Sequence, residues 1–262
     1  MLLNSVILIL REVLEAAILV CVLLALSRSL RIGPRWFWYS LPLGLLGTVI
    51  VAYNLDGITD ALDGAGQEVV NATLQSVVYC LTVAIVWFSF KEQQARVSAK
   101  VLTPLMAVAV GCAMTREGSE MLIYIKGFAA VEEQRTAVYA GSAIGAGIGL
   151  SLGVLLYSAL GALRDSRTIA SCAMLLALIG SGMVMQAVML LEQVDWLPAG
   201  QAIWDTSDLI SEQSITGELL YAVFGYESTP GVLHVTLYIL SIGITAVVYY
   251  LSRYRGRHVD LR

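Results

Sequence analysis

The chain has 262 residues, of which 58% are hydrophobic and only 14% are charged. A soluble domain of this length carries about 25% charged residues, so this composition excludes a soluble globular protein and favours an integral membrane protein. The net charge of −4 is small, and no basic block indicates binding to nucleic acid.

Long apolar runs follow one another along the chain. A transmembrane helix needs about 20 consecutive apolar residues, and such runs in lipid are helical. Seven stretches qualify: residues 2–26, 36–56, 69–90, 101–125, 136–162, 168–191 and 231–251. The first lacks the basic start and small-residue cleavage site of a signal peptide, so we expect it to be retained as a span. The sequence therefore predicts an all-α integral membrane protein with seven transmembrane helices.

The connections between these spans differ sharply in charge. Twelve of the 16 basic residues follow the first, third, fifth and seventh spans: Arg28, Arg31, Arg35, Lys91, Arg96, Lys100, Arg164, Arg167, Arg253, Arg255, Arg257 and Arg262. Only Lys126 and Arg135 lie in the alternate connections. Because basic loops stay in the cytoplasm, the N-terminus is predicted to lie outside and the C-terminus in the cytoplasm.

The opposite side is predicted to be acidic. Its carboxylates include a group after the second span and one at the outer end of the sixth: Asp56, Asp60, Asp63, Glu68 and Glu192. Together with the acidic connection 192–230, they would attract cations towards an external vestibule, although each alone is typical of a solvated loop. That connection is too long for a turn, and "LISEQSITGELLYAVFGY" within it has helical spacing. We expect a short helix there, lying at the outer surface.

Two predicted spans carry charges in their apolar centres. "LREVLE" places Arg11, Glu12 and Glu15 in the first span. "TREGSE" places Arg116, Glu117 and Glu120 in the fourth. Each such charge costs about 2.5–3.5 kcal/mol at a helix centre, so it needs a partner or a function. In each RExxE motif the two glutamates lie on one helical face. One motif alone could be an Arg–Glu network that holds helices together.

The motifs repeat at a fixed distance. Each residue of the second copy lies 105 positions after its counterpart, with three spans between the copies. An odd number of spans reverses the direction of entry, which predicts an inverted-topology repeat with a site near the midplane. We expect one transmembrane domain over residues 1–262. Its parts are repeat A at about 1–100, repeat B at about 101–192, the external connection at about 192–230 and the seventh span at about 231–251.

Four converging carboxylates indicate a hard, oxygen-rich cation site. Fe(II), Fe(III) and Mn(II) fit this chemistry, whereas zinc more often takes His or Cys, and only His234 and His258 are present. The two arginines would cancel part of the negative charge and let the ion leave. Tyr124 lies four residues after Glu120 and could add a phenol, although an interfacial aromatic residue is the simpler interpretation. Asp56, Asp60, Asp63, Glu68 and Glu192 are further accessory candidates.

The paired motifs "REVLE" and "REGSE" resemble those of the high-affinity, oxidase-dependent iron permeases, over essentially the whole chain. "WDTSDLI" and "VFGYESTP" in the last connection are similar to the bacterial branch. The resemblance implies iron import across the plasma (inner) membrane of a bacterium. It also implies Glu12, Glu15, Glu117 and Glu120 as ligands and Arg11 and Arg116 as motif partners. A separate periplasmic or extracellular protein would oxidise or bind the iron.

This sequence departs from the family pattern in two places. The first motif has Val13 where Gly is usual, whereas the second keeps Gly118. Asn71 stands where relatives often carry a further glutamate. Glu192 matches a position where relatives have glutamate.

Other functions remain open at this point. One is a permease for another hard or heavy cation, such as lead or manganese. Another is an intramembrane oxidoreductase, but the motifs lack the ExxH pairs of di-iron proteins and the four cysteines form no CxxC pair. We therefore expect a transporter, not an enzyme, with iron as the transported substrate and no organic cofactor. The cysteines are expected to be buried and unpaired.

Overall fold

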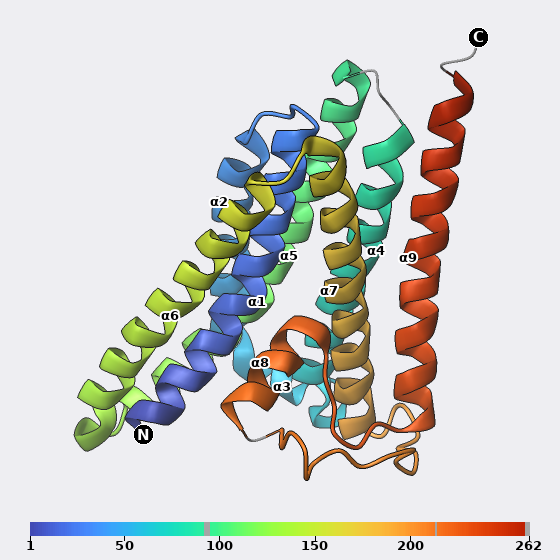
Figure 1. The fold of residues 1–262 in the computed structure, drawn as a ribbon. Coiled ribbons are helices and arrows are strands. Elements are labelled where there is room, and N and C mark those ends of the chain that lie inside the picture. Colours follow the sequence, from blue (N-terminus) through green and yellow to red (C-terminus); the bar gives the residue numbers. More distant parts are fainter. Residues whose placement is uncertain (92–94, 213, 260–262) are drawn as a thin grey trace.

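The computed structural model describes residues 1–91, 95–212 and 214–259, and every regular element in them is helical (Figure 1). The helices are α1 (Leu2–Ser29), α2 (Arg35–Tyr53), α3 (Leu55–Asp60), the 3-10 helix η1 (Ala61–Gly64), α4 (Gly66–Lys91), α5 (Ala95–Ala129), α6 (Glu132–Gly161), α7 (Asp165–Gln193), α8 (Ile215–Phe224) and α9 (Val232–Val259). The all-α prediction is confirmed, and each of the seven apolar runs corresponds to one long helix.

Six of these helices are long and apolar enough to cross a membrane: α2, α4, α5, α6, α7 and α9. The chain is thus a multi-pass membrane protein. Helix α1 is 28 residues long, but its charged residues, including those of the first motif, exclude it from this group of six. The count of seven spans therefore stays a prediction.

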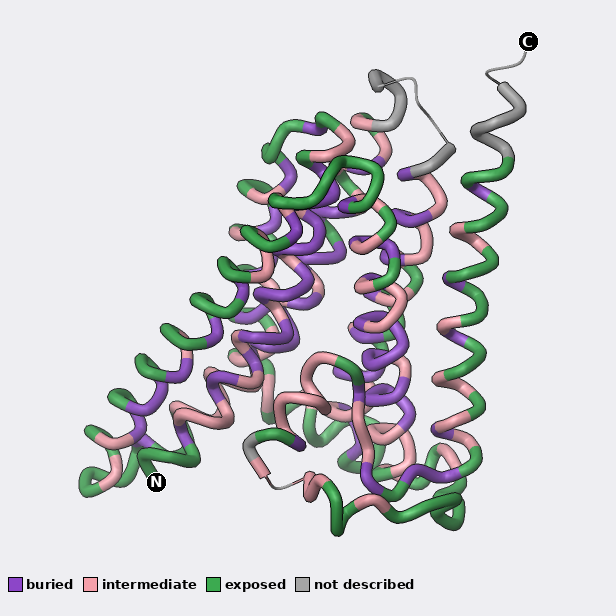
Figure 2. The backbone as a smooth tube through the Cα atoms, in the orientation of Figure 1, coloured by how far each residue is buried: buried purple, intermediate pink, exposed green. Residues whose placement is uncertain are grey.

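The long helices form a bundle with three close pairs. Helix α1 packs along α6, α2 along α5, and α4 along α7, while α9 lies outside against α4 and α7 (Figure 1). Burial follows this arrangement: α1 and α7 are purple through much of their length, whereas α6 and α9 turn long green stretches outwards (Figure 2). Those outward faces carry the apolar side chains suited to lipid.

Glycines allow the helices of the α1–α6 pair and of the α2–α5 pair to approach closely. A Cβ atom on Gly145 of α6 would lie 2.5 Å from the Val6 carbonyl oxygen of α1. On α2, a Cβ atom at Gly47 would lie 2.1 Å from Oγ1 of Thr115 of α5. Small residues at such crossings let helix backbones pack where lipid supplies no hydrophobic driving force. This packing brings the two motif-bearing helices to fixed positions in the bundle.

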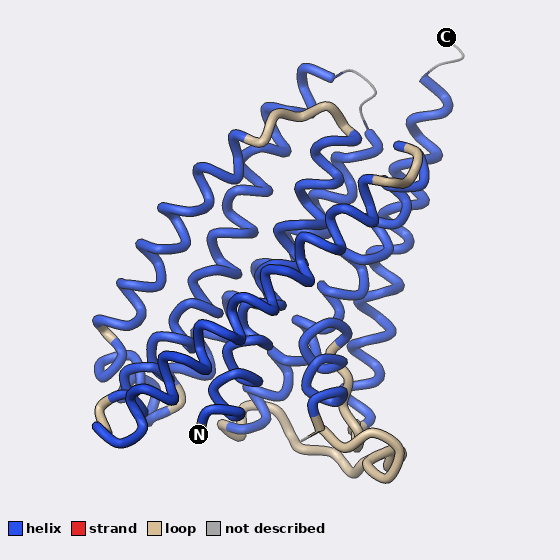
Figure 3. The backbone as a smooth tube through the Cα atoms, turned by 60° about the vertical axis from the view of Figure 1, so that its left-hand side comes forward, coloured by secondary structure: helices blue, strands red, loops and turns tan. Residues whose placement is uncertain are grey.

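The bundle has two ends with different structure. We call the end that holds Met1, α3 and α8 the N-terminal face, and the opposite end the C-terminal face (Figure 1). The connection between α7 and α8 forms the long tan segment at the N-terminal face in Figure 3. Helix α8 is capped at its start by Ser214, whose side chain accepts a hydrogen bond from the Gly217 N–H, and at its end by Gly225, which has a φ of 66°.

The short helix expected in the last connection is present, but its position differs from the expectation. Helix α8 packs against α1 and α7, and its Leu219 and Val223 contact the hydrophobic core. It reaches into the bundle because its apolar side chains pack on the core and its Glu218 pairs with Arg11 of α1. The exposed Trp196 and Trp204 remain at the surface of the N-terminal face.

All four cysteines are free, as expected. Cys21 and Cys172 are buried and Cys112 is partly buried. The expectation of burial is wrong for Cys80, which is exposed on α4. An apolar run shows that a residue lies in the membrane, but it does not show which side of the helix meets lipid.

Candidate functional site

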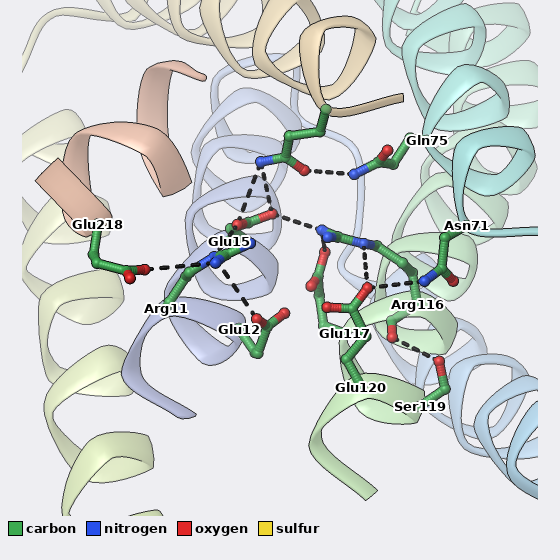
Figure 4. A network of polar contacts seen from close by, with 11 residues as sticks. Arg11, Glu12, Glu15, Asn71, Gln75, Arg116, Glu117, Ser119, Glu120 and Glu218 are labelled. Carbon is green, nitrogen blue, oxygen red and sulfur yellow. Dashed lines mark hydrogen bonds and ion pairs between the residues drawn. The ribbon is translucent and has the colours of Figure 1, made fainter. Parts of the chain in front are cut away.

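The two RExxE motifs face one another across the interface of α1 and α5, in the middle of the bundle (Figure 4). Four of the six motif side chains are almost fully enclosed, with Glu12 only 2% and Glu117 only 1% exposed. Charges buried this deeply in an apolar bundle require compensation by one another or by a ligand. The structure thus brings together both motifs, which are 105 residues apart in sequence.

Three of the four glutamates form a compact group, which we call the carboxylate triad. One carboxylate oxygen from each of Glu12, Glu117 and Glu120 lies within 4.8 Å of the others. The Oε2 atoms of Glu12 and Glu117 are buried and have no hydrogen-bond partner. Like charges this close repel, and buried polar atoms without partners are costly. A hard cation among these oxygens would relieve both penalties.

Glu15 has different surroundings. Its Oε2 accepts a hydrogen bond of 2.8 Å from Nη1 of Arg116, and both of its oxygens lie 3.4 Å from Nε2 of Gln186. Nε of Arg11 lies 3.5 Å from Oε1. Both oxygens of this carboxylate therefore have protein donors, whereas Glu12 and Glu117 of the triad each keep one buried oxygen without a donor. Since α1 runs away from the N-terminal face, Glu15 lies one turn beyond Glu12 towards the C-terminal face.

Arg116 connects the motifs. Its Nη1 lies 2.8 Å from both Glu15 and Glu117, and its Nε lies 3.2 Å from Glu120. One guanidinium thus pairs with three carboxylates from both helices, which a planar group with several donors can do. Its side chain is 5% exposed.

Arg11 is placed less deeply. Its side chain is 24% exposed and lies 3.5 Å from Glu218 of α8. Its guanidinium carbon stands 4.5 Å from the centre of the Tyr221 ring, a cation–π contact. The two motifs are therefore not equivalent: Arg116 is central and buried, whereas Arg11 links α1 to α8.

A cavity of about 520 Å³ leads to the triad from the N-terminal face. Its lining comes from α1, α4, α5 and α7: Leu8, Glu12, Gln67, Glu68, Asn71, Glu120, Ile123, Tyr124, Gly127, Phe128, Leu190 and Gln193. Asn71 donates a hydrogen bond of 3.0 Å to Glu120 Oε1 and so orients that carboxylate. Asn71 therefore supplies an amide that holds a triad member.

Five of the six accessory candidates separate into two groups. Glu68 and Tyr124 line the cavity, and the Tyr124 hydroxyl lies 2.7 Å from Ser5 Oγ. Asp56, Asp60 and Asp63 lie in α3 and η1, exposed at the N-terminal face and outside the cavity lining. The second group can act on an approaching cation only through long-range attraction.

Glu192 belongs to a separate polar group. Its Oε2 lies 3.0 Å from Nε2 of His234, whose Nδ1 lies 3.1 Å from Glu227. Burial raises the pKa of Glu227, the imidazole of His234 opposes this, and the carboxylates of Glu212 and Glu192 raise it further. These contacts fasten the connection before α9 to the end of α7, away from the triad.

Several polar residues at the site were not identified from the sequence. Gln75 and Gln186 lie in the apolar runs 69–90 and 168–191, and Gln75 Nε2 donates to Gln186 Oε1. Polar side chains inside membrane helices are costly and are often functional, so their position was an available signal. Glu218 and Tyr221 had no such signal, because only the fold brings α8 to Arg11.

In a comparison with protein families, the model of the iron permease FTR1 family matches residues 2–254. Neither the curated proteins nor the solved structures contain a match to this chain. The family is one of transporters and not of enzymes, and iron is its substrate. The match covers nearly the whole chain, including both RExxE motifs and α8. This multi-pass membrane protein therefore belongs to the iron permease FTR1 family.

Proposed function

We propose that this permease imports iron across the plasma (inner) membrane of a bacterium and that the carboxylate triad is its ion-binding site. The observation that carries the proposal is the grouping of Glu12, Glu117 and Glu120 at the end of an open cavity, with two buried oxygens unpartnered. Glu15 is the fourth motif carboxylate, and Arg11 and Arg116 balance the charge. Glu68 and Tyr124 lie along the approach as accessory groups.

Helix pairing supports the inverted repeat. If α1, α2 and α4 correspond to α5, α6 and α7, a pseudo-twofold axis exchanges the α1–α6 pair with the α5–α2 pair. The third pair, α4–α7, maps onto itself. These are the three close pairs of the bundle. Repeat A would span residues 1–100 and repeat B residues 101–192, followed by the connection 192–230 and the last span, in a single permease domain.

The same correspondence accounts for the difference between the motifs. Gly118 of the second motif packs on α2, where an added Cβ atom would lie 2.5 Å from Thr48 Oγ1. At the equivalent crossing of the first motif, Val13 packs on Gly149 of α6. The small residue needed at the crossing is therefore supplied by the partner helix, so Val13 is compatible with the same arrangement.

The charge distribution supports an external N-terminal face. The basic residues at the ends of α1, α4, α6 and α9 and at the start of α5 and α7 all lie at the C-terminal face; Arg262 is outside the described residues. The cavity would then open outwards, beside the acidic α3 and connection 192–230. We propose that a separate periplasmic or extracellular protein oxidises or delivers iron at this mouth.

Metal uptake by the purified protein in lipid vesicles tests the function. We expect iron to accumulate in vesicles that contain the protein, with Fe(II) and Fe(III) supplied separately under controlled redox conditions. Manganese and lead are measured in the same vesicles, because oxygen ligands alone do not exclude them. Uptake of manganese or lead without iron would replace the proposed substrate. The absence of any metal uptake by folded protein would contradict the transport function.

Single-cysteine labelling tests the orientation. In a chain whose native cysteines are replaced by alanine, Ser207→Cys lies exposed in the connection before α8, and Ser166→Cys lies exposed at the start of α7. An impermeant thiol reagent applied to intact cells should modify the first and spare the second, because the two positions lie at opposite faces. Labelling should be reversed if the C-terminal face is external. Permeabilised cells, in which both positions should react, provide the control.

A further inference from the structure

A second group of polar side chains, Glu15, Gln186 and Gln75, contacts Arg116 through Glu15 and lies apart from the carboxylate triad. Glu15 does not belong to the carboxylate triad, and its nearest neutral partner is the side-chain amide of Gln186, at 3.4 Å from each carboxylate oxygen. That amide is in turn hydrogen-bonded to Gln75 of α4. Both glutamines are 2% exposed, and Gln75 Oε1 is buried without a hydrogen-bond partner. A buried amide that is only partly satisfied requires an explanation beyond packing.

A small cavity lies beside Glu15 and Gln186. A cavity of about 10 Å³ is lined by Glu15 and Gln186 together with Ile18, Ile179, Gly182, Met183 and Ala222. It has room for about one water molecule. Because α1 and α4 run towards the C-terminal face, Glu15 lies one turn further from the open mouth than Glu12, and Gln75 one turn further than Asn71, which both line the large cavity. Helix α7 runs the other way, so Gln186 lies one turn further from the mouth than Leu190, which also lines that cavity.

We propose that Glu15, Gln75 and Gln186 form a second, inner position for the transported cation, which receives it from the triad past Arg116. This inference rests on the proposed transport function and adds a binding position to it. The ligands would be the Glu15 carboxylate and the amide oxygens, which are hard donors suited to the same cation.

Gln75 and Gln186 can exchange the roles of donor and acceptor and still be hydrogen-bonded to one another. In the structure, Gln186 turns its Nε2 donor to Glu15 and accepts a hydrogen bond from Gln75. A half-turn of both amides reverses the Gln75–Gln186 bond and places an oxygen, in place of the N–H, opposite Glu15. Ligands on one hard cation with bonds of about 2.1 Å stand about 3 Å apart, close to the present 3.4 Å separation. One amide atom of Gln75 lacks a partner in either state, so the exchange gives up only the contacts of Gln186 with Glu15, which the cation would replace.

Arg116 lies between the two positions. Its Nη1 contacts both Glu15 and Glu117, and these two contacts have the same length of 2.8 Å. A cation at the triad would repel the guanidinium towards Glu15, and a cation at the inner position would repel it towards Glu117. Arg116 can therefore neutralise the carboxylate of whichever position holds no cation. Beyond the inner position, Ile18, Ile179 and Met183 belong to the apolar core, so release on that side requires those helices to separate.

Substitutions at Gln186 distinguish an ion ligand from a structural residue. Gln186→Met keeps the length of the side chain and removes both polar atoms, whereas Gln186→Glu keeps oxygen ligands and removes the donor. We expect Gln186→Met to bind Tb(III), a hard luminescent probe, with wild-type affinity at the triad but to lower iron uptake per molecule by about tenfold or more. Gln186→Glu should restore most of the uptake. Gln75→Met should act like Gln186→Met and tests the same position from α4.

Ser181→Ala is the matched control. Ser181 is also fully buried on α7, and its hydroxyl bonds only to the carbonyl of Ala177 within its own helix. It should leave both Tb(III) binding and uptake unchanged. Wild-type uptake in both methionine variants would overturn the inner position. So would loss of both binding and uptake in Gln186→Met without recovery in Gln186→Glu, because that pattern marks a structural residue. These outcomes are separate from failure of the transport function, which the wild-type vesicles alone would show.

Discussion

Replacing Glu117 by Gln is expected to lower iron uptake per folded molecule by at least about tenfold. Even outer-shell partners of a metal typically change affinity by about 10–100-fold, and Glu117 is proposed as a direct ligand. It is 1% exposed, and its Oε2 is buried without a partner beside the triad. Gln keeps the shape and can still accept from Arg116, but it loses the charge that binds a hard cation. The measurement is uptake in vesicles, divided by the amount of folded protein.

The same substitution at an exposed glutamate is the control. Glu132 lies exposed at the start of α6, at the same face of the bundle, and Glu132→Gln removes one negative charge there as well. It should leave uptake close to wild type, whereas Glu12→Gln and Glu120→Gln should behave like Glu117→Gln. Full uptake per molecule in all three triad variants would contradict the assignment of the triad as the transport site. A parallel loss in Glu132→Gln would mean that surface charge alone is responsible.

The largest effect on stability is expected from Arg116. Arg116→Gln leaves the buried Glu15 and Glu117 and the partly exposed Glu120 without their shared cation, and an uncompensated buried charge costs about 3–5 kcal/mol. Arg11→Gln should cost much less, because Arg11 is 24% exposed and its contacts with Glu12, Glu15 and Glu218 are 3.5–3.8 Å long, against 2.8 Å for the two shortest contacts of Arg116. Thermal unfolding in detergent and the yield of folded protein measure this difference.

Paired variants show whether the effect arises from the ion pairs. Adding Glu15→Gln to Arg116→Gln should recover part of the lost thermal stability, because it removes one of the stranded charges, but it should not recover uptake. Arg116→Lys should keep the charge yet impair transport, since an ammonium cannot reproduce the planar contacts to three carboxylates. Equal destabilisation by Arg11→Gln and Arg116→Gln would contradict the central position of Arg116. Absence of any recovery in the pair would contradict the Glu15–Arg116 contact.

Sequence reasoning reached the motif residues but not their separate roles. The i, i+3 spacing predicted that Glu12 and Glu15 share a face of α1, and both are buried towards α5. That spacing does not state which neighbour each carboxylate meets. One turn of helix separates the two, which is enough to place Glu12 in the triad and Glu15 beside Arg116 and Gln186.

The accessory residues show the same limit. Asp56, Asp60, Asp63 and Glu68 lie close together in sequence, yet only Glu68 lines the cavity. Glu68 is in the first turn of α4, which continues into the bundle, whereas the three aspartates lie in the short elements before it. Sequence distance could not separate them, because a turn of backbone between η1 and α4 decides which carboxylate faces inwards.

The helical class, the positions of the long helices and the two charged motifs could be predicted from the amino-acid sequence alone. The reason is that lipid permits few alternatives: an apolar run of about 20 residues is a helix, and a charge within it needs a partner. Helix packing, in contrast, was needed to show that three glutamates form the triad, that Gln186 contacts Glu15, and that α8 reaches Arg11. These contacts depend on how closely helices approach at positions such as Gly145 and Gly47, and the periodicity of one helix carries no information about that distance.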